Sequence, residues 1–478
     1  MADANSVSPG LATLGAGGWT VTEPSAGGRF GSVGVLTPQQ TLAIQALVSG
    51  AGNVPLPTIG KPLAASLDAA SGCTASNAAL TYVTRVAPNG QTLRGVRVTG
   101  NGLAANCSVD IPLTLTSTVP NGRVSLLLYI PPETAALSAG MTFYLGDSGF
   151  ANFFSRNVTM SRHGWRQFSP APATSDYTIK WGTGGGAPAF GTTTFAKARV
   201  RFDITTGQVP VYEVYAVLED CGPSPAPICF TFDDCYISQY NLAAPLLERY
   251  GLRGSFAVIS DLIGSNPAVY MSWDQLRELR DRGHEINVHG PIGGSGSLLN
   301  YAGSASRYQS VFDDVSYHRN AIINNGCNIN GSANCYVFPQ GNDAFSAGDT
   351  TIWDALTAIG IKCGRGVDNT QVDMLNAWGA GRPTQYASII GHSWSSPVTE
   401  AANIAALQQR IIDNVAAKRH SVFMGHYVTS AAAAAALEIQ ASNLELILQT
   451  AEAQIATGNA VNVTMTGLYK AHTGRFPV

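Results

Sequence analysis

The chain has 478 residues, too many for one ordinary domain of roughly 100 to 200 residues, so we expect two or three folding units. Only 12% of residues are Asp, Glu, Lys or Arg, while glycine (51) and proline (25) are abundant. This composition favours β structure and a surface of Ser, Thr, Asn and Gly. The 28 basic and 31 acidic residues give a formal charge of −3, which excludes nucleic acid and an anionic membrane as main partners.

Residues 1–60 are rich in Gly, Ala, Ser and Pro, and we interpret them as an attachment or linker segment. A short helix is predicted at Thr37–Val48, because Thr37 suits an N-cap, proline follows at once, and Ser49-Gly50 follows the end. A signal peptide needs a basic segment and an apolar stretch of about 7–15 residues, and none is visible. We therefore expect a cytoplasmic chain or export by another route. No apolar run approaches the ~20 residues of a membrane span, so no span is expected.

Residues 61–220 show the period-two alternation of β-strands, separated by turn signals such as Pro88-Asn-Gly90 and Asn101-Gly102. This pattern predicts an all-β sandwich, or two small ones in tandem, with a carbohydrate-binding or a structural role. The predicted strands are Leu80–Val86, Leu93–Thr99, Ile111–Thr116, Arg123–Ile130, Thr142–Leu145, Tyr177–Trp181, Lys197–Ile204 and Tyr212–Leu218.

Four residues of this region suit a sugar-binding face: Tyr144, Asn152, Trp165 and Trp181. The alternative is that the aromatic rings fill the core of the sandwich, which is the commoner role of such residues.

The pattern changes after a proline-rich linker at Glu219–Pro227. Apolar strands then alternate with amphipathic helices over 221–478, which predicts a parallel α/β barrel or a doubly wound sheet. In either fold, chemistry gathers at the carboxyl ends of the strands. The predicted strands are Ile228–Phe232, Gly254–Val258, Glu285–His289, Tyr336–Phe338, Ile361–Gly364, Ala387–Ile390 and Ser421–Gly425, and the predicted helices are 238–250, 272–282, 306–325, 350–359, 398–418 and 442–457.

Polar groups follow four of these strands. Asp233-Asp234 ends the first, where one carboxylate can bind a cation while the other stays free as a base. His289 and His426 end two others, and the Pro-Gln-Gly turn after Phe338 presents backbone N–H groups that suit an oxyanion. Each feature alone is compatible with a turn, a helix cap or a structural histidine. Their convergence on one edge of the sheet is less expected by chance than any single feature, so we predict that the chemistry of the protein takes place there.

The eight cysteines are too sparse for a disulfide scaffold, and no Cys-x-x-Cys pair is present, so a structural zinc knuckle is not expected. Free thiols and a few surface disulfides both remain open for the clusters at 73/107, 221/229/235 and 327/335, and Cys363 stands alone.

The order of these motifs over roughly 226–470 resembles the polysaccharide deacetylases, carbohydrate esterase family four. Thr231-Phe-Asp-Asp234 is similar to the first family motif, Arg282-Gly-His-Glu-Ile286 with His289 to the second, Phe338-Pro-Gln-Gly341 to the third, and the strand ending in His426 to the fifth. The resemblance implies a distorted (β/α) barrel after the all-β sandwich, in a multidomain chain.

The resemblance also implies roles for the site residues. Asp234 and His289 would bind a divalent metal, usually Zn²⁺, and Asp233 would be the general base. His426 would be the general acid, and the N–H of Gln340 would help to hold the oxyanion. We also expect the neighbouring Phe338, Pro339 and Tyr427 to contact substrate.

Four positions depart from the family pattern, and one of them is Gln340, where tyrosine is common. Gly293 stands where a second metal histidine is usual, so His392 is the preferred third ligand, with His318 and Asn287 as alternatives. Val337 stands where an arginine usually orients the base, so Asp233 needs another partner. Cys235 stands where glycine is usual, and it could pair with Cys229 or Cys221 or simply pack.

The N-terminal half, with its low charge and its segment Leu36–Asn53, resembles phage tail spike or tail-fibre proteins. The resemblance implies an extracellular enzyme on the virion tail that deacetylates capsule, exopolysaccharide or O-antigen, and a homotrimer if the chain is a tail spike. Two alternatives stay open. The chain could be a glycan-binding protein whose deacetylase-like site has decayed, or an exported bacterial deacetylase acting on peptidoglycan or chitin.

Overall fold

The chain divides into two units, Met1–Val54 and Pro55–Val478, in the computed structural model. In the first unit, β1 (Ala12–Gly15) and β2 (Gly18–Val21) form an antiparallel hairpin. The helix predicted at 37–48 lies outside the described residues. The structure describes residues 12–15, 18–21, 61–62, 67, 72–86, 92–113, 124–137, 139–160, 163–168, 177–180, 195–219, 225–290, 296–346, 349–367, 374–377, 384–390, 401–416, 420–433, 435 and 437–473.

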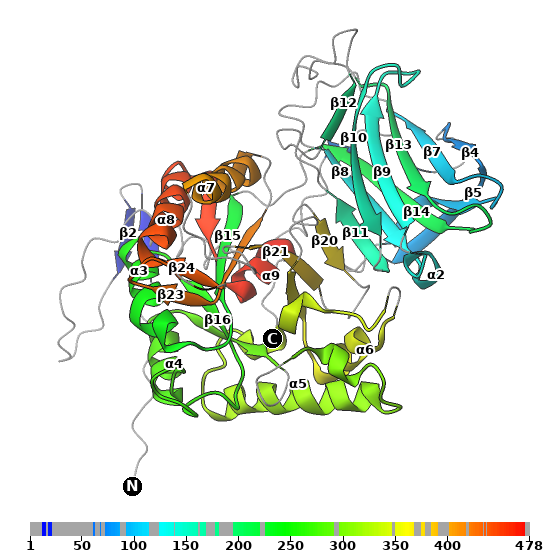
Figure 1. Ribbon diagram of the computed structural model, residues 1–478. Helices are drawn as coiled ribbons and strands as arrows, with labels where there is room; N and C mark the ends of the chain where they lie inside the picture. Colours follow the sequence, from blue (N-terminus) through cyan, green and yellow to red (C-terminus); the bar gives the residue numbers. More distant parts are fainter. Residues whose placement is uncertain are drawn as a thin grey trace. The chain divides into compact units, whose positions relative to one another are not determined.

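Two antiparallel sheets form the predicted β-sandwich (Figure 1). The core of the sandwich is formed by every second side chain of each strand. In β13, for example, Ala198, Val200 and Phe202 are buried and the residues between them are more exposed. One sheet has the order β12 (Tyr177–Lys180), β10 (Phe153–Met160), β9 (Ala139–Gly146), β13 (Lys197–Asp203), β7 (Asn106–Pro112) and β4 (Thr74–Ser76). The other has β11 (Gly164–Phe168), β8 (Val124–Ile130), β14 (Val211–Glu219), β6 (Thr92–Gly100) and β5 (Ala78–Val86), with β3 (Lys61–Pro62) beside β14 and the short helix α2 (Pro132–Ala135) after β8.

The predicted strands match most of this sandwich, with corrections. The strand predicted at Ile111–Thr116 begins earlier, as β7 (Asn106–Pro112), and the sequence did not predict β3, β4, β10 and β11. The strands β3 and β4 are very short, and β10 and β11 carry polar and aromatic residues in place of a plain apolar alternation, so the period-two signal is weak in all four.

The four candidate sugar-binding residues do not share one face. Tyr144 lies on β9, with its ring against Phe150 and Phe153, whereas Trp165 lies on β11 in the other sheet and packs on Tyr215. Asn152 donates to Asp147 within its own loop at 2.7 Å. Trp181 lies outside the described residues.

Seven parallel strands make the second body of this unit: β15 (Ala226–Phe232), β16 (Gly254–Val258), β17 (Glu285–His289), β18 (Cys335–Val337), β19 (Cys363–Val367), β21 (Thr384–Ile390) and β22 (Ser421–Gly425). Neighbours pair in parallel from β15 to β19, and the pairings β19–β21, β21–β22 and β22–β15 close the ring. This closure favours the barrel over the doubly wound sheet. Nearly every residue of β15, β16, β17 and β22 is buried, as expected for parallel strands covered on both sides.

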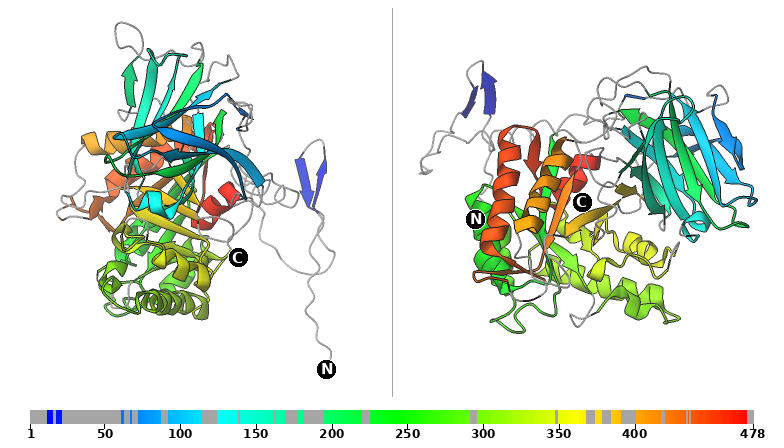
Figure 2. Two further views of the ribbon diagram at one scale, coloured as in Figure 1. Left: turned by 90° about the vertical axis from the view of Figure 1, so that its right-hand side faces the viewer. Right: turned by 45° about the horizontal axis from the view of Figure 1, so that its top comes forward.

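The helices follow the strands at the predicted places. They are the π-helical turn η2 (Gln239–Ala243) continuing into α3 (Ala244–Arg249), then α4 (Trp273–Asp281), α5 (Arg307–Asn324), α6 (Thr351–Ile359), α7 (Ala401–Ala416) and α8 (Ala441–Ala456). A capping box starts α4, since Ser272 accepts from the N–H of Gln275 and the Gln275 side chain accepts from the N–H of Ser272. In Figures 1 and 2, α7 and α8 lie side by side. Short segments complete the region: η3 (Leu298–Tyr301), η4 (Ser332–Asn334), η5 (Pro339–Gly341), β23 (Tyr427–Thr429), β24 (Glu438–Gln440) and β25 (Ala460–Asn462).

One helix that was not predicted, α9 (Met465–Thr473), packs against β15. Its first N–H groups are satisfied from inside the barrel, where Ser255 accepts from Met465 at 2.9 Å and Glu285 accepts from Thr466 at 3.0 Å. A carboxylate at a helix N-terminus is electrostatically favourable, although burial raises the pKa of Glu285 above its usual range. Glu285 therefore has a structural role at the amino end of β17.

The two bodies of this unit share a sheet edge, because β20 (Met374–Ala377) pairs with β11 of the sandwich and with β21 of the barrel. Among the helices of the described residues, none is long and apolar enough to cross a membrane.

Candidate active site

Four predicted side chains meet at the carboxyl ends of three strands: Asp233 and Asp234 after β15, His289 on β17 and His426 after β22. The Nε2 atom of His289 lies 3.3 Å from Oδ1 of Asp234. The Nε2 atom of His426 lies 3.7 Å from Asp234 and 3.9 Å from Asp233. The convergence expected from the sequence is therefore present in the structure.

The turn after β15 has a strained backbone. Asp234 and Cys235 both have positive φ, 69° and 51°, in the left-handed region that non-glycine residues seldom adopt. Gln239 holds this turn, since its amide donates to the carbonyl oxygens of both Asp233 and His426. The free thiol of Cys235 packs in the interior near the carbonyl of Ile259. Of the two alternatives for Cys235, packing is therefore confirmed and a disulfide is not formed.

Arg365 on β19 is the partner that Asp233 needs. Its guanidinium donates to Oδ1 of Asp233, and both side chains are almost fully buried. Burial alone would raise the pKa of Asp233, but the charges of Arg365, His289 and His426 outweigh it and hold that pKa below its usual value. Asp233 is therefore an ionised carboxylate at neutral pH.

The hydrogen bonds of His289 fix its tautomer. Its Nδ1–H donates to the carbonyl oxygen of Val337 at 2.8 Å, which leaves Nε2 facing Asp234. Burial acts to lower the pKa of His289, but the carboxylates of Asp234 and Asp233 outweigh it and raise the pKa. A histidine held at Nδ1 by a carbonyl, with Nε2 toward a carboxylate, is oriented as metal-ligating histidines usually are.

His426 is only 4% exposed, and burial is the main reason that its pKa is lowered, against the opposing effect of Asp233 and Asp234. At neutral pH the ring is therefore mostly neutral. It can act as a general acid only after it takes up a proton within the reaction cycle.

Two side chains suit a divalent cation, Asp234 through a carboxylate oxygen and His289 through Nε2. Within the described part of the chain, no group of three or more His, Cys, Asp and Glu residues is arranged to hold a metal ion. The preferred third ligand, His392, and position 293 both lie outside the described residues.

The two alternatives for the third ligand are engaged elsewhere. His318 on α5 accepts from the N–H of Ser260 at 3.2 Å, and its Nε2 lies 3.2 Å from Asp314. Asn287 donates to the carbonyl oxygen of Ser332 at 3.0 Å. Both side chains are fully buried, and these contacts give each a structural role.

Gln340 occupies the predicted turn after β18, with a left-handed φ of 56°. The hydrogen bonds that close this turn are donated by Gly341 to Phe338 and by Asn342 to Pro339, so the Gln340 N–H takes no part in them. Gly341 must be glycine, because its φ is 74° and an added Cβ would lie 2.7 Å from the backbone nitrogen of Val367.

Two of the residues expected to contact substrate are corrected. Phe338 is fully buried and packs on the rings of Tyr336 and Trp353, and Pro339 is buried at the start of the turn. Apolar side chains at the end of a barrel strand are drawn into the core, which the motif alone does not reveal. Tyr427 is only half-buried, and its ring lies edge-on to Tyr236.

Arg365 is the residue of this centre that the sequence analysis missed. A signal was present, because Gly364-Arg-Gly366 places a charge at the end of an apolar strand in a chain with few charges. Arg365 pairs in register with Val337, the position where the family usually has its arginine. The guanidinium thus comes from the neighbouring strand.

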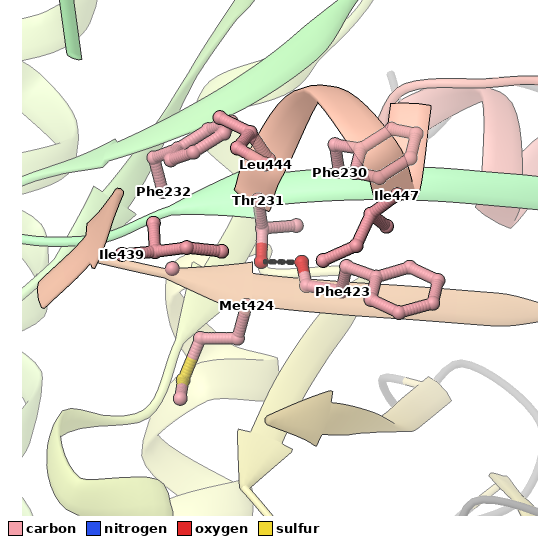
Figure 3. Close-up of a pocket in the computed structure, with 9 residues that line it drawn as sticks. Phe230, Thr231, Phe232, Phe423, Met424, Ile439, Leu444 and Ile447 are labelled. Carbon is pink, nitrogen blue, oxygen red and sulfur yellow. Dashed lines mark hydrogen bonds between the residues drawn. The ribbon is translucent and has the colours of Figure 1, made fainter. Parts of the chain in front are cut away.

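An apolar crevice lies near this centre but is separate from it (Figure 3). None of the residues that line it is ionisable, and the one hydrogen bond drawn runs from the Thr231 hydroxyl to the carbonyl oxygen of Phe423 at 2.8 Å. The labelled side chains come from β15, β22, β24 and α8: Phe230, Thr231, Phe232, Phe423, Met424, Ile439, Leu444 and Ile447. It is a packing feature between the barrel wall and α8.

The site combines a buried carboxylate that has a guanidinium partner, a carboxylate–histidine pair and a second histidine, at the carboxyl edge of a parallel barrel. This arrangement is suited to hydrolysis. Residues 222–363 match the sequence model of the family described as polysaccharide deacetylase. This segment contains Asp233, Asp234 and His289 but ends before Arg365. The family match and the site support a carbohydrate esterase.

Three proteins of known name are similar to parts of this chain. The chain is 31% identical over 71 residues to the protein YxkH of Bacillus subtilis (strain 168), which is named after the same family, and spans 25% of the length of that relative and 15% of its own. The family 4 carbohydrate esterase from Streptomyces lividans, solved with acetate, is 15% identical, with 53% of this chain and 97% of that chain covered and a TM-score of 0.31. A family 11 carbohydrate-binding module from Clostridium thermocellum is 10% identical, with 34% and 99% covered and a TM-score of 0.24.

Proposed function

We propose that this protein is a metal-dependent polysaccharide deacetylase that hydrolyses acetyl groups on a bacterial surface polysaccharide. The convergence of Asp233, Asp234, His289 and His426 carries this proposal. When bound, a divalent cation such as Zn²⁺ would supply Lewis acidity toward water and the acetyl carbonyl, and Asp234 and His289 would hold it.

The side chains of this chain divide the remaining work. Asp233, held ionised by Arg365, accepts the proton of the attacking water. This proton then moves from Asp233 to the Nε2 atom of His426, 3.9 Å away, and His426 passes it to the departing sugar oxygen or nitrogen, so both side chains return to their starting charge states. The backbone N–H of Gln340 stabilises the negative charge that develops on the acetyl oxygen.

Acetate release tests the proposal. Purified full-length protein, loaded with Zn²⁺, is incubated with acetylated bacterial polysaccharides, and acetate is measured. The variant Asp233→Asn should lose activity by about 10²–10⁴-fold, the usual contribution of a general base. The matched control is Asp274→Asn on the surface of α4, whose carboxylate is 84% exposed and should leave the rate unchanged. Equal acetate release by wild type and Asp233→Asn would refute the assignment.

We also propose that the enzyme acts outside the cell, on the virion tail, against capsule, exopolysaccharide or O-antigen. The Gly- and Ser-rich, weakly charged composition and the segment 36–53 support this proposal. Mass spectrometry of purified virions tests it, and detection of the protein only in bacterial cell walls would favour an exported bacterial deacetylase instead.

A further inference from the structure

Three tyrosines lie directly beside the catalytic side chains. Tyr236 follows Asp234 by two residues, and Tyr427 follows His426 directly. Tyr270, from the segment before α4, stacks on Tyr236 with ring centroids 5.7 Å apart and an interplanar angle of 22°. The ring of Tyr427 meets Tyr236 edge-on at 5.4 Å. We call Tyr236, Tyr270 and Tyr427 the tyrosine platform.

Backbone hydrogen bonds hold the platform in place. Ile237 donates to Val269 at 2.7 Å and Met271 donates to Cys235 at 3.0 Å, which fixes Tyr236 against Tyr270. On the other side, Tyr427 donates from its N–H to the carbonyl of Leu437 at 3.1 Å. The platform is therefore assembled before any ligand binds, which reduces the entropy lost on binding.

The platform is not simply part of the core. All three side chains are half-buried, and Tyr236 and Tyr427 belong to none of the buried clusters, although Tyr270 packs against the barrel core. None of the three hydroxyls forms a hydrogen bond with another residue of the described ranges. Three partly exposed rings with available hydroxyls combine an apolar surface with polar donors, as binding sites for sugars require.

We propose that the tyrosine platform is a substrate subsite that stacks on a neutral pyranose ring of the polysaccharide chain, next to the sugar that loses its acetyl group. This inference rests on the proposed function. The rings offer flat faces for the C–H groups of a pyranose, and the platform itself carries no ionic side chain, so a neutral sugar fits it better than an acidic one. The platform would make the enzyme prefer a chain over a single sugar.

Binding to the full-length Asp233→Asn protein tests the subsite without turnover. The probes are chitopentaose and an O-acetylated xylopentaose, with N-acetylglucosamine as the single-sugar comparison, measured by calorimetry. Replacing one stacking ring, in Tyr270→Ala or Tyr427→Ala, should weaken binding of a pentasaccharide about tenfold. Tyr270→Phe should retain most of the affinity, because it keeps the ring. The single sugar should be affected much less than the chain.

The control variant is Leu446→Ala, which removes a 42% exposed apolar side chain of α8 and should bind like the parent. Tyr236→Leu removes the third ring but keeps apolar volume, so it tests the platform if Tyr270→Ala or Tyr427→Ala does not fold. Absence of binding to both pentasaccharides, or equal affinity of parent and ring-deleted variants, would overturn the subsite. Acetate release by wild type with no effect of the platform variants would remove the subsite and leave the proposed function. Binding that depends on the platform, without acetate release by the wild type, would keep the subsite and contradict the proposed function.

Discussion

Arg365 and Asp233 form a buried ion pair between side chains that stand 132 residues apart in the chain. The carboxylate sits after β15 and the guanidinium on β19, which lie on the barrel wall with three strands between them in one direction. Burying two charged side chains costs free energy unless they are well paired. Because this pair lies at the candidate site, we infer that it serves to keep Asp233 ionised.

Replacing Arg365 should change both rate and pH dependence. In Arg365→Ala the pKa of Asp233 rises, because its largest stabilising charge is gone. The acidic limb of the pH–rate profile should then move to higher pH, and the rate at neutral pH should fall by about a hundredfold. Arg365→Lys should recover part of both effects. A lower rate with an unmoved acidic limb would mean that Arg365 serves only the fold.

The same variant should also be less stable. Removing one partner of a buried pair leaves an uncompensated charge, which costs about 3–5 kcal/mol. Chemical denaturation of Arg365→Ala measures this loss, and Arg365→Ala/Asp233→Asn should recover part of it because the second change removes the orphaned charge.

Metal content should depend on Asp234 and His289. Wild-type protein dialysed against Zn²⁺ should retain metal by elemental analysis. His289→Ala should retain at least tenfold less under the same conditions, because it removes one of the two proposed ligands. His318→Ala is the matched control, because His318 is engaged by Ser260 and Asp314. Metal retained equally by wild type and His289→Ala would contradict the ligand assignment.

The free energy of unfolding should decrease when the pH is lowered, because His284 takes up a proton. This fully buried ring accepts from the N–H of Gly254 at Nδ1 and faces Glu248 through Nε2, and burial lowers its pKa to about 4. In the unfolded chain the same histidine has an ordinary pKa near 6.5, so the unfolded state binds a proton at a higher pH than the folded state. The neutral His284 therefore contributes about 3 kcal/mol to the free energy of unfolding above about pH 6.5, and this contribution is lost progressively as the pH falls toward 4.

Denaturation of wild type and His284→Gln between pH 4 and 8 measures this effect. Glutamine can accept from Gly254 and donate to Glu248 without titrating, so the variant should show a shallower pH dependence. An identical slope in both proteins would place the acid sensitivity elsewhere.

Substitutions in the turn at Gln340 should show whether its backbone or its side chain serves the reaction. Gln340→Gly removes the backbone strain of a non-glycine residue in the left-handed region and should raise the free energy of unfolding by about 1 kcal/mol. It also keeps the N–H, so activity should stay within a few-fold of wild type. Gly341→Ala should instead destabilise the protein, since its Cβ would meet the backbone of Val367. A large loss of activity in Gln340→Gly would assign the role to the side chain.

Local pattern predicted all seven barrel strands, but the strand predicted at Ile361–Gly364 lies further along the chain, as β19 (Cys363–Val367), which carries Arg365. The strands Gly254–Val258, Glu285–His289 and Ser421–Gly425 were predicted with the bounds that the structure has. Short apolar runs that end in polar residues are a local signal, because a parallel strand buried on both sides needs both faces apolar. The same signal located Asp233, Asp234, His289 and His426.

Tertiary structure decided what those residues contact. The pairing of Arg365 with Asp233, the contact of Glu285 with the start of α9 and the burial of Phe338 in the core all depend on side chains from distant segments. Strand alternation and motif spacing fix which residues reach the barrel edge. Partners across the barrel are chosen by packing and by the need to pair buried charge, and these become defined only when the ring of strands closes.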